Sequence, residues 1–260
     1  IQTSLVGSEM CIRDSLKTSK DCKRYLNKRN LSDETIKYFK LGFSSNSNQT
    51  LYQFLKEQNF EDKELLESNV VKLDKNNKIR DFFYNRLMFP ITNEYGKIVG
   101  FGGRVLDNSN PKYINSPESD FFKKRNILYN LYNAKQTIRS KKNMLICEGY
   151  MDVISLYDKN IKTAVAPLGT SLTESHLIFS WKYVNKPTLM FDGDTSGLKA
   201  SFKSAVMSLP YLTPSKLLQF VILPNEYDPD TYINEFSLNE FAKYLKNPLS
   251  IVDFIFEAVS

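Results

Sequence analysis

The eight residues Pro187–Asp194 read PTLMFDGD and decide how the second half of the chain folds. A strand-forming, mostly apolar run, Thr188–Phe191, leads straight into Asp192 and Asp194, which are separated by a single glycine. Two carboxylates this close repel each other unless a proton or a cation lies between them. The stretch therefore predicts a buried strand that ends at an edge where a counter-charge is needed.

The segments around this strand alternate between strand and helix patterns. Apolar strands are expected at 144–147, 163–166, 188–191 and 217–223, and amphipathic helices at 151–158, 173–183 and 197–208. Unbroken apolar strands separated by helices are typical of a parallel sheet that is covered on both faces. The second half is therefore predicted to be α/β, and the apolar residues of its tail, 238–258, recur at helical spacing.

The first half has a different pattern, which predicts an α+β subdomain. Helices are expected within 20–30, 32–41, 51–59, 61–67 and 127–138, a strand at 70–73, and polar or irregular loops at 46–49 and 112–125. From Asp81 onward, apolar residues recur at every second position. The runs 86–91 and 98–104 flank a turn at Asn93–Gly96. That arrangement is typical of a β-hairpin.

Composition limits the classes of protein that the chain can belong to. The 260 residues are 42% hydrophobic and 13% aromatic, which is enough for a sizeable core, and no stretch is long and apolar enough to predict a membrane span. The formal charge of +6 and the pI near 9.0 suit a polyanionic partner without requiring one.

Cysteine usage predicts a reducing, cytoplasmic setting. The three cysteines are scattered and never form Cys-x-x-Cys, so neither a disulfide framework nor a zinc site is expected. The single histidine, His176, is interpreted as a surface or partly buried side chain rather than a ligand. Residues 1–15 differ in character from the rest of the chain and are interpreted as a foreign or artefactual segment.

Acidic residues follow three of the expected strands. Glu148 follows the first, Asp192 and Asp194 follow the third, and Asp228 and Asp230 follow the last. In a parallel sheet the carboxyl ends of the strands meet at one edge, so these side chains are expected to gather there. Each acid could simply cap the next helix. Capping alone does not require acids on both sides of Gly193 and of Pro229, and oxygen-only ligands predict Mg²⁺ or Mn²⁺.

Several motifs resemble those of a known family. The segments 148–153 (EGYMDV), 168–170 (LGT) and 191–197 (FDGDTSG) resemble a Toprim domain, the module shared by topoisomerases and primases. The segments 86–91 (RLMFPI), 100–104 (GFGGR), 112–118 (KYINSPE) and 128–131 (LYNL) resemble bacterial replicative, DnaG-type primases, as do 223–224 (LP) and 228–230 (DPD). The likeness runs from about Lys20 to the end of the chain.

The resemblance implies an enzyme that makes short RNA primers on single-stranded DNA from ribonucleoside triphosphates. It implies that Glu148, Asp192 and Asp194 are catalytic, and that these three with Asp228 and Asp230 bind the metal. It also implies that cationic side chains contact template and nucleotide phosphates: Arg86, Lys112, Lys123, Lys124 and Arg125. Aromatic neighbours, Tyr113, Phe121 and Phe122, suit base stacking. The family often has Lys-Gly-Arg where this chain has Lys124-Arg125-Asn126, which leaves open which cation holds the nucleotide.

The resemblance also predicts a division of the chain. Residues 16–140 are expected to form an N-terminal primase-core subdomain, 141–225 the Toprim domain, and 226–260 a metal loop with the start of a C-terminal helical subdomain. A zinc module and a helicase-binding domain are expected to be missing, so no zinc is expected and the replicative helicase would bind elsewhere. Two alternatives stay open: a Toprim nuclease or topoisomerase, and a non-catalytic scaffold that binds single-stranded DNA.

Overall fold

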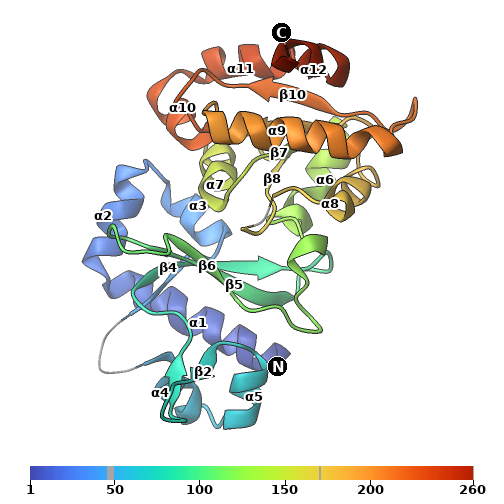
Figure 1. The fold of residues 1–260 in the computed structure, drawn as a ribbon. Coiled ribbons are helices and arrows are strands. Elements are labelled where there is room, and N and C mark those ends of the chain that lie inside the picture. Colours follow the sequence, from blue (N-terminus) through green and yellow to red (C-terminus); the bar gives the residue numbers. More distant parts are fainter. Residues whose placement is uncertain (46–49, 170, 260) are drawn as a thin grey trace. The chain divides into compact units, whose positions relative to one another are not determined.

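The computed structural model describes residues 1–45, 50–169 and 171–259, which form two compact units, Ile1–Lys123 and Lys124–Ser260 (Figure 1). The polar loop expected at 46–49 lies outside the described residues. Within the described ranges, no helix has the length and apolar character needed to cross a membrane.

The first unit is built on a four-stranded antiparallel sheet in the order β1-β4-β5-β6. Its strands are β1 (Gly42–Ser44), β4 (Arg86–Thr92), β5 (Ile98–Val105) and β6 (Tyr113–Asn115). The predicted hairpin is confirmed, because β4 pairs with β5 around the turn and Gly96 adopts a left-handed φ of 82° there.

Among the described residues, five helices and a second, smaller hairpin complete the first unit. They are α1 (Gln2–Thr18), α2 (Lys20–Lys28), α3 (Asp33–Tyr38), α4 (Leu51–Glu57), α5 (Asp62–Glu67), β2 (Val71–Leu73) and β3 (Ile79–Asp81). Side-chain caps explain several helix starts: Ser19, Ser32 and Thr50 each accept a hydrogen bond from a backbone N–H in the first turn.

Residues 1–15 are packed rather than extended. They belong to α1, whose Leu5 and Ile12 enter the apolar core of the first unit. A Cβ on Gly42 would lie 2.7 Å from the Ile12 backbone, so α1 and β1 are in close contact. The interpretation of this segment as foreign rests on its sequence and stays a prediction.

The second unit contains a five-stranded sheet in the order β11-β10-β9-β7-β8. Strands β7 (Leu145–Ile146), β8 (Ala164–Val165), β9 (Thr188–Phe191) and β10 (Gln219–Ile222) are parallel, and β11 (Leu249–Ser250) is antiparallel to β10. The expected parallel sheet is therefore confirmed.

Helices connect and cover these strands. They are α6 (Leu131–Lys141), α7 (Tyr150–Asp158), α8 (Glu174–Ser180), α9 (Thr195–Ser208), α10 (Pro229–Glu235), α11 (Leu238–Lys246) and α12 (Ile251–Val259), with short 3₁₀ turns η1 (Lys124–Asn126) and η2 (Leu209–Tyr211). Because α7, α8 and α9 each connect two parallel strands, all three begin at the edge where the strands end.

The core of the second unit contains residues from both ends of its sequence. Ile138 of α6 and Phe254 of α12 are buried in it, and the Phe254 ring stacks on Phe220 of β10 at 4.1 Å. Helix α6 thus packs with the sheet that comes after it in the chain, and α12 packs with the sheet that comes before it. The predicted boundaries at 140/141 and 225/226 accordingly do not coincide with the division into compact units at Lys123/Lys124.

Candidate active site

The carboxyl ends of β7, β9 and β10 lie at one edge of the second unit's sheet, which we call the acidic edge. Glu148 follows β7 and Asp192 follows β9, and the Asp192 N–H donates a hydrogen bond to Glu148 Oε1 at 3.0 Å. The backbone of the loop after β9 therefore holds the side chain of Glu148, which follows β7.

Gly193 brings the third loop against the second. Its N–H donates to Tyr227 O at 2.8 Å, and a Cβ at this position would lie 2.2 Å from Pro224 O and 2.6 Å from Leu223 O. Only a residue without a side chain fits in that space. The glycine between Asp192 and Asp194 is thus required by the loop that carries Asp228.

Asp194 and Asp228 also serve as helix caps. Asp194 Oδ1 accepts from the Gly197 N–H at 2.7 Å at the start of α9, and Asp228 Oδ1 accepts from the Thr231 N–H at 2.6 Å at the start of α10. Capping and clustering therefore occur together, because each cap engages one carboxylate oxygen at the same edge.

The electrostatics of Glu148 reflect this clustering. Burial raises its pKa above the ordinary range, and the negative charges of Asp194 and Asp228 raise it further, while the Asp192 N–H opposes the shift. Four predicted carboxylates, those of Glu148, Asp192, Asp194 and Asp228, are thus brought together by loops that are far apart in the sequence.

Asp230 differs from these four. It is only 1% exposed, and its Oδ1 accepts hydrogen bonds from Ser155 Oγ of α7 and from Asn234 Nδ2 of α10. These contacts fasten α10 to α7 and favour a structural role for Asp230 rather than the predicted role as a metal ligand.

Asp152 belongs to the acidic edge although the sequence analysis assigns it no role. It is 7% exposed and lies in the first turn of α7, where its Oδ2 accepts from the Gly149 N–H at 2.9 Å. Burial raises its pKa well above the ordinary range, and Asp228, Asp192 and Glu148 add to the shift. Its position four residues after Glu148, in the first turn of the next helix, is the signal that could have revealed it.

The donor chemistry of the acidic edge fits a hard divalent cation. The ligands on offer are carboxylate oxygens, and their mutual repulsion would be relieved by positive charge. Within the described part of the chain, no group of three or more His, Cys, Asp or Glu side chains is arranged to hold a metal ion directly. Mg²⁺ keeps several waters and needs only one or two protein carboxylates, so the set fits a hydrated ion.

Arg86, a predicted phosphate contact in the first unit, is a buried residue. It is 8% exposed, and its Nη1 donates to the carbonyl oxygens of Gly103, Pro111 and Lys112 at 3.3, 3.0 and 3.4 Å. Burial lowers its pKa, and the charge of Asp107 partly offsets that effect. Arg86 therefore ties the segment before β6 to β5, although it also borders a pocket of about 570 Å³ beside Tyr84.

The other predicted cations of the first unit are more accessible. Lys112 and Lys123 are exposed, and Lys123 Nζ lies 4.0 Å from Asp120 Oδ1. Phe121 is also exposed, whereas Phe122 is fully buried. Phe122 is thus a core residue and is not available for the base stacking expected of it.

Lys124 and Arg125 form η1 in the second unit, next to α8. Because α8 begins where β8 ends, this turn lies at the same edge of the sheet as the carboxylates. His176 of α8 is fully buried and is hydrogen-bonded within the protein, so the expectation of a surface or partly buried side chain is wrong.

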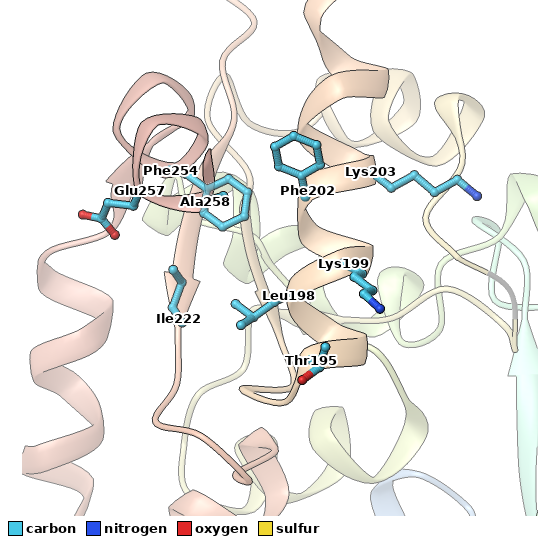
Figure 2. Close-up of a pocket in the computed structure, with 9 residues that line it drawn as sticks. All are labelled: Thr195, Leu198, Lys199, Phe202, Lys203, Ile222, Phe254, Glu257 and Ala258. Carbon is cyan, nitrogen blue, oxygen red and sulfur yellow. The ribbon is translucent and has the colours of Figure 1, made fainter. Parts of the chain in front are cut away.

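A pocket of about 610 Å³ opens between α9, β10 and α12 (Figure 2). Its lining is mostly apolar, including Leu198, Phe202 and Phe254, with the two lysines of α9 on one wall. One end reaches Thr195, which directly follows Asp194. The pocket therefore borders the acidic edge without containing its carboxylates.

Comparisons with known proteins agree with this architecture. Residues 12–135 match the family described as the DNA primase catalytic core, N-terminal domain, and residues 145–233 match a Toprim-like family. A solved DnaG primase catalytic domain bound to single-stranded DNA is 34% identical, with a TM-score of 0.89 over 99% of this chain and 81% of that one. The chain belongs to the DnaG primase family. The Escherichia coli primase catalytic core gives a TM-score of 0.90 at 33% identity, covering 99% of this DnaG-family chain and 83% of that chain.

Curated DnaG primases show the same relationship at the level of sequence. The DNA primase of Buchnera aphidicola is 38% identical over 236 residues, and that of Haemophilus influenzae is 36% identical over 248 residues. These alignments cover 91% and 95% of this chain but 41% and 42% of the relatives. The chain thus spans about two fifths of the length of these DnaG primases.

Proposed function

We propose that this chain is the RNA-polymerase core of a DnaG-type primase and synthesises short RNA primers on single-stranded DNA. The observation that carries the proposal is the acidic edge, where Glu148 and Asp192 are joined by a hydrogen bond and Asp194 and Asp228 lie close enough to raise the Glu148 pKa. Nucleotidyl transfer needs a cluster that can bind a metal, because negative charge develops on the attacking 3′-oxygen and is carried by the departing pyrophosphate.

We assign Mg²⁺ or Mn²⁺ to Glu148, Asp192, Asp194 and Asp228. When bound, the metal supplies positive charge that stabilises the attacking 3′-oxygen and the leaving pyrophosphate. Asp230 joins this set only through α10, which it fastens to α7. Asp152 supports Glu148 by bonding the N–H of Gly149, the residue next to it.

We assign proton transfer to Glu148. Its Oε1 is engaged by the Asp192 N–H, so Oε2 is the oxygen that would accept the proton of the primer 3′-hydroxyl.

The cationic residues bind phosphates in this proposal. Lys124 and Arg125, at the same sheet edge as the carboxylates, would hold the triphosphate of the incoming ribonucleotide. Lys112 and Lys123 would contact the template backbone, where exposed cations release condensed counter-ions. Arg86 shapes the loop that carries Lys112.

The roles of the whole protein extend the proposal. A solved Aquifex aeolicus primase with zinc-binding and RNA-polymerase domains is 32% identical, with a TM-score of 0.87, and this chain covers 60% of it. We propose that primer initiation involves a zinc-binding domain of that kind, that the replicative helicase is contacted through a C-terminal domain, and that the protein acts in the cytoplasm.

The test is incorporation of radiolabelled ribonucleotides on single-stranded templates with Mg²⁺, with a zinc module supplied separately. Glu148→Gln and Asp192→Asn are expected to lower incorporation by about 100-fold or more, while Glu257→Gln, an exposed acid on α12, stays at the wild-type level. Two outcomes would overturn the proposal. The first is cleavage of supercoiled DNA without nucleotides. The second is a wild-type chain that synthesises no primer but binds DNA without metal, with binding unchanged in Asp192→Asn.

A further inference from the structure

The basic turn η1 is held by its backbone. His176 Nε2 lies 2.9 Å from Lys124 O, and Thr173 Oγ1 donates to Arg125 O at 3.1 Å. Both carbonyls belong to the residues whose side chains are assigned to the nucleotide triphosphate. Two side chains from the start of α8 thus hold the backbone from which both cations project.

His176 is itself fixed by a reciprocal cap. The Thr173 N–H donates to His176 Nδ1 at 3.2 Å, and the His176 N–H donates to Thr173 Oγ1 at 3.3 Å. Because Nδ1 accepts a hydrogen bond, the neutral ring carries its proton on Nε2 and donates it to Lys124 O. The cap of α8 therefore sets the tautomer that reaches the turn.

The turn itself is a short element. It is a single 3₁₀ turn of three residues, followed by one backbone bond from the Ile127 N–H to Lys124 O. Short 3₁₀ segments have poor hydrogen-bond geometry and depend on their surroundings. Lys124 is half-buried, whereas its partner His176 is completely buried, so the fixed partner in this contact is α8.

We propose that Thr173 and His176 are positioning residues that hold the Lys124–Arg125 turn in register with the acidic edge for binding a nucleoside triphosphate. This inference rests on the proposed function and adds two residues to its site. It predicts that losing the contact to Lys124 O weakens nucleotide binding even when the cap of α8 is kept.

A pair of amide variants separates the two roles of His176. Asparagine places its oxygen where Nδ1 lies, so His176→Asn keeps the cap but is too short to reach Lys124 O. Glutamine places a donor near the position of Nε2, so His176→Gln keeps the contact with the turn. Both side chains are neutral and polar, which makes each a control for the other.

Two measurements on the full chain decide the outcome. The first is hydrogen exchange of the peptide spanning 121–128, expected to speed up in His176→Asn and to stay near wild type in His176→Gln. The second is equilibrium binding of ATP with Mg²⁺, expected to weaken about tenfold in His176→Asn and less than about twofold in His176→Gln. Lys124→Ala and Arg125→Ala serve as references for loss of the cations themselves.

The results distinguish this inference from the proposed function. Wild type that binds ATP but incorporates no nucleotide would sink primer synthesis and leave the positioning role standing. Unchanged exchange and unchanged ATP binding in His176→Asn would overturn the positioning role, and so would a wild-type chain that binds no ATP. Should His176→Asn fail to fold, Thr173→Val against Thr173→Ser tests the second contact, with Arg125 O, because serine keeps the hydroxyl that valine lacks; valine also loses the cap of α8, so the exchange of the 121–128 peptide is compared with that of α8 itself.

Discussion

The backbone N–H of Asp192 donates to Glu148 Oε1 at 3.0 Å, so the acid of one strand end is held by the loop of its neighbour. The two residues are 44 positions apart, and the parallel pairing of β7 with β9 brings them together. This contact couples the shape of the acidic edge to the integrity of the sheet. We therefore expect changes that move either loop to lower activity more than they lower the free energy of unfolding.

Gly193→Ala tests the fit between the loops. The new methyl group would overlap Pro224 O, so the loop must move, and we expect a loss of about 1–3 kcal/mol in the free energy of unfolding with a larger loss of nucleotide incorporation. Urea denaturation and primer synthesis measure the two effects. Gly149→Ala is the matched control, since its nearest neighbour would be Asp152 Oδ2 at an ordinary 3.5 Å. Equal behaviour of the two variants would contradict the prediction.

We expect a change at Asp228 to lower activity and a change at the contacts of Asp230 to lower stability. Asparagine caps helices as well as aspartate does, so Asp228→Asn is expected to keep stability and lose activity. Ser155→Ala removes a donor to the buried Asp230, which should cost about 1–3 kcal/mol of stability. Denaturant midpoints and incorporation rates check both, and a stable, active Asp228→Asn variant would argue against the assigned metal role.

Arg86 and Lys112 should also behave differently. Arg86→Ala removes the donor to three carbonyls, of which that of Gly103 is buried, and is expected to destabilise the protein by about 1–3 kcal/mol. Lys112→Ala, at an exposed site, should stay within about 0.5 kcal/mol of wild type and lower the salt dependence of template binding by about one counter-ion. Urea denaturation measures the stability of both variants, and fluorescence anisotropy at several salt concentrations measures their binding to the template. A Lys112 variant with wild-type salt dependence would remove it from the template path.

Metal binding should be visible without any reaction. A ligand that binds only the folded state at ten times its Kd adds about 1.4 kcal/mol, which corresponds to a rise in Tm of roughly 3–6 °C. We expect this rise with MgCl₂, its reversal by EDTA, and no comparable rise with NaCl at equal ionic strength. Asp192→Asn should shrink the rise, and an identical rise in that variant would place the ion elsewhere.

The stability of the second unit should depend on pH through His176. Burial lowers the pKa of this ring below 6.5, with hydrogen bonds to Lys124 and Ile127 opposing the shift. The unfolded chain then binds a proton near pH 6.5 that the folded chain does not bind. The contribution of His176 to the free energy of unfolding is therefore fully present above pH 6.5. It decreases as the pH drops from 6.5 toward the lower pKa of the ring in the folded state.

Urea denaturation at closely spaced values between pH 7.5 and pH 5 measures this slope. His176→Gln lacks the titrating ring but keeps a donor for Lys124 O, so its curve should be flatter than that of wild type over this range. Parallel curves for the two proteins would show that other groups are responsible.

Much of this protein could be predicted from the order of its residues. The alternation of apolar strands and amphipathic helices is a local property, so the parallel sheet, the hairpin and the acids at the strand ends all follow from spacing alone. What the sequence could not determine is which way each acid faces. Asp228 and Asp230 are two residues apart, yet one caps a helix at the edge while the other is sealed between α7 and α10.

Tertiary packing decided the remaining roles for the same reason. Arg86 and Phe122 sit in motifs that suggest contact with nucleic acid, and burial turned both inward. Asp152 and His176 drew no functional interpretation, although the spacing of Asp152 from Glu148 offered a signal. Asp152 is affected by the charge of Asp228, 76 positions away, and His176 contacts Lys124, 52 positions away, and both relationships exist only once the chain has folded.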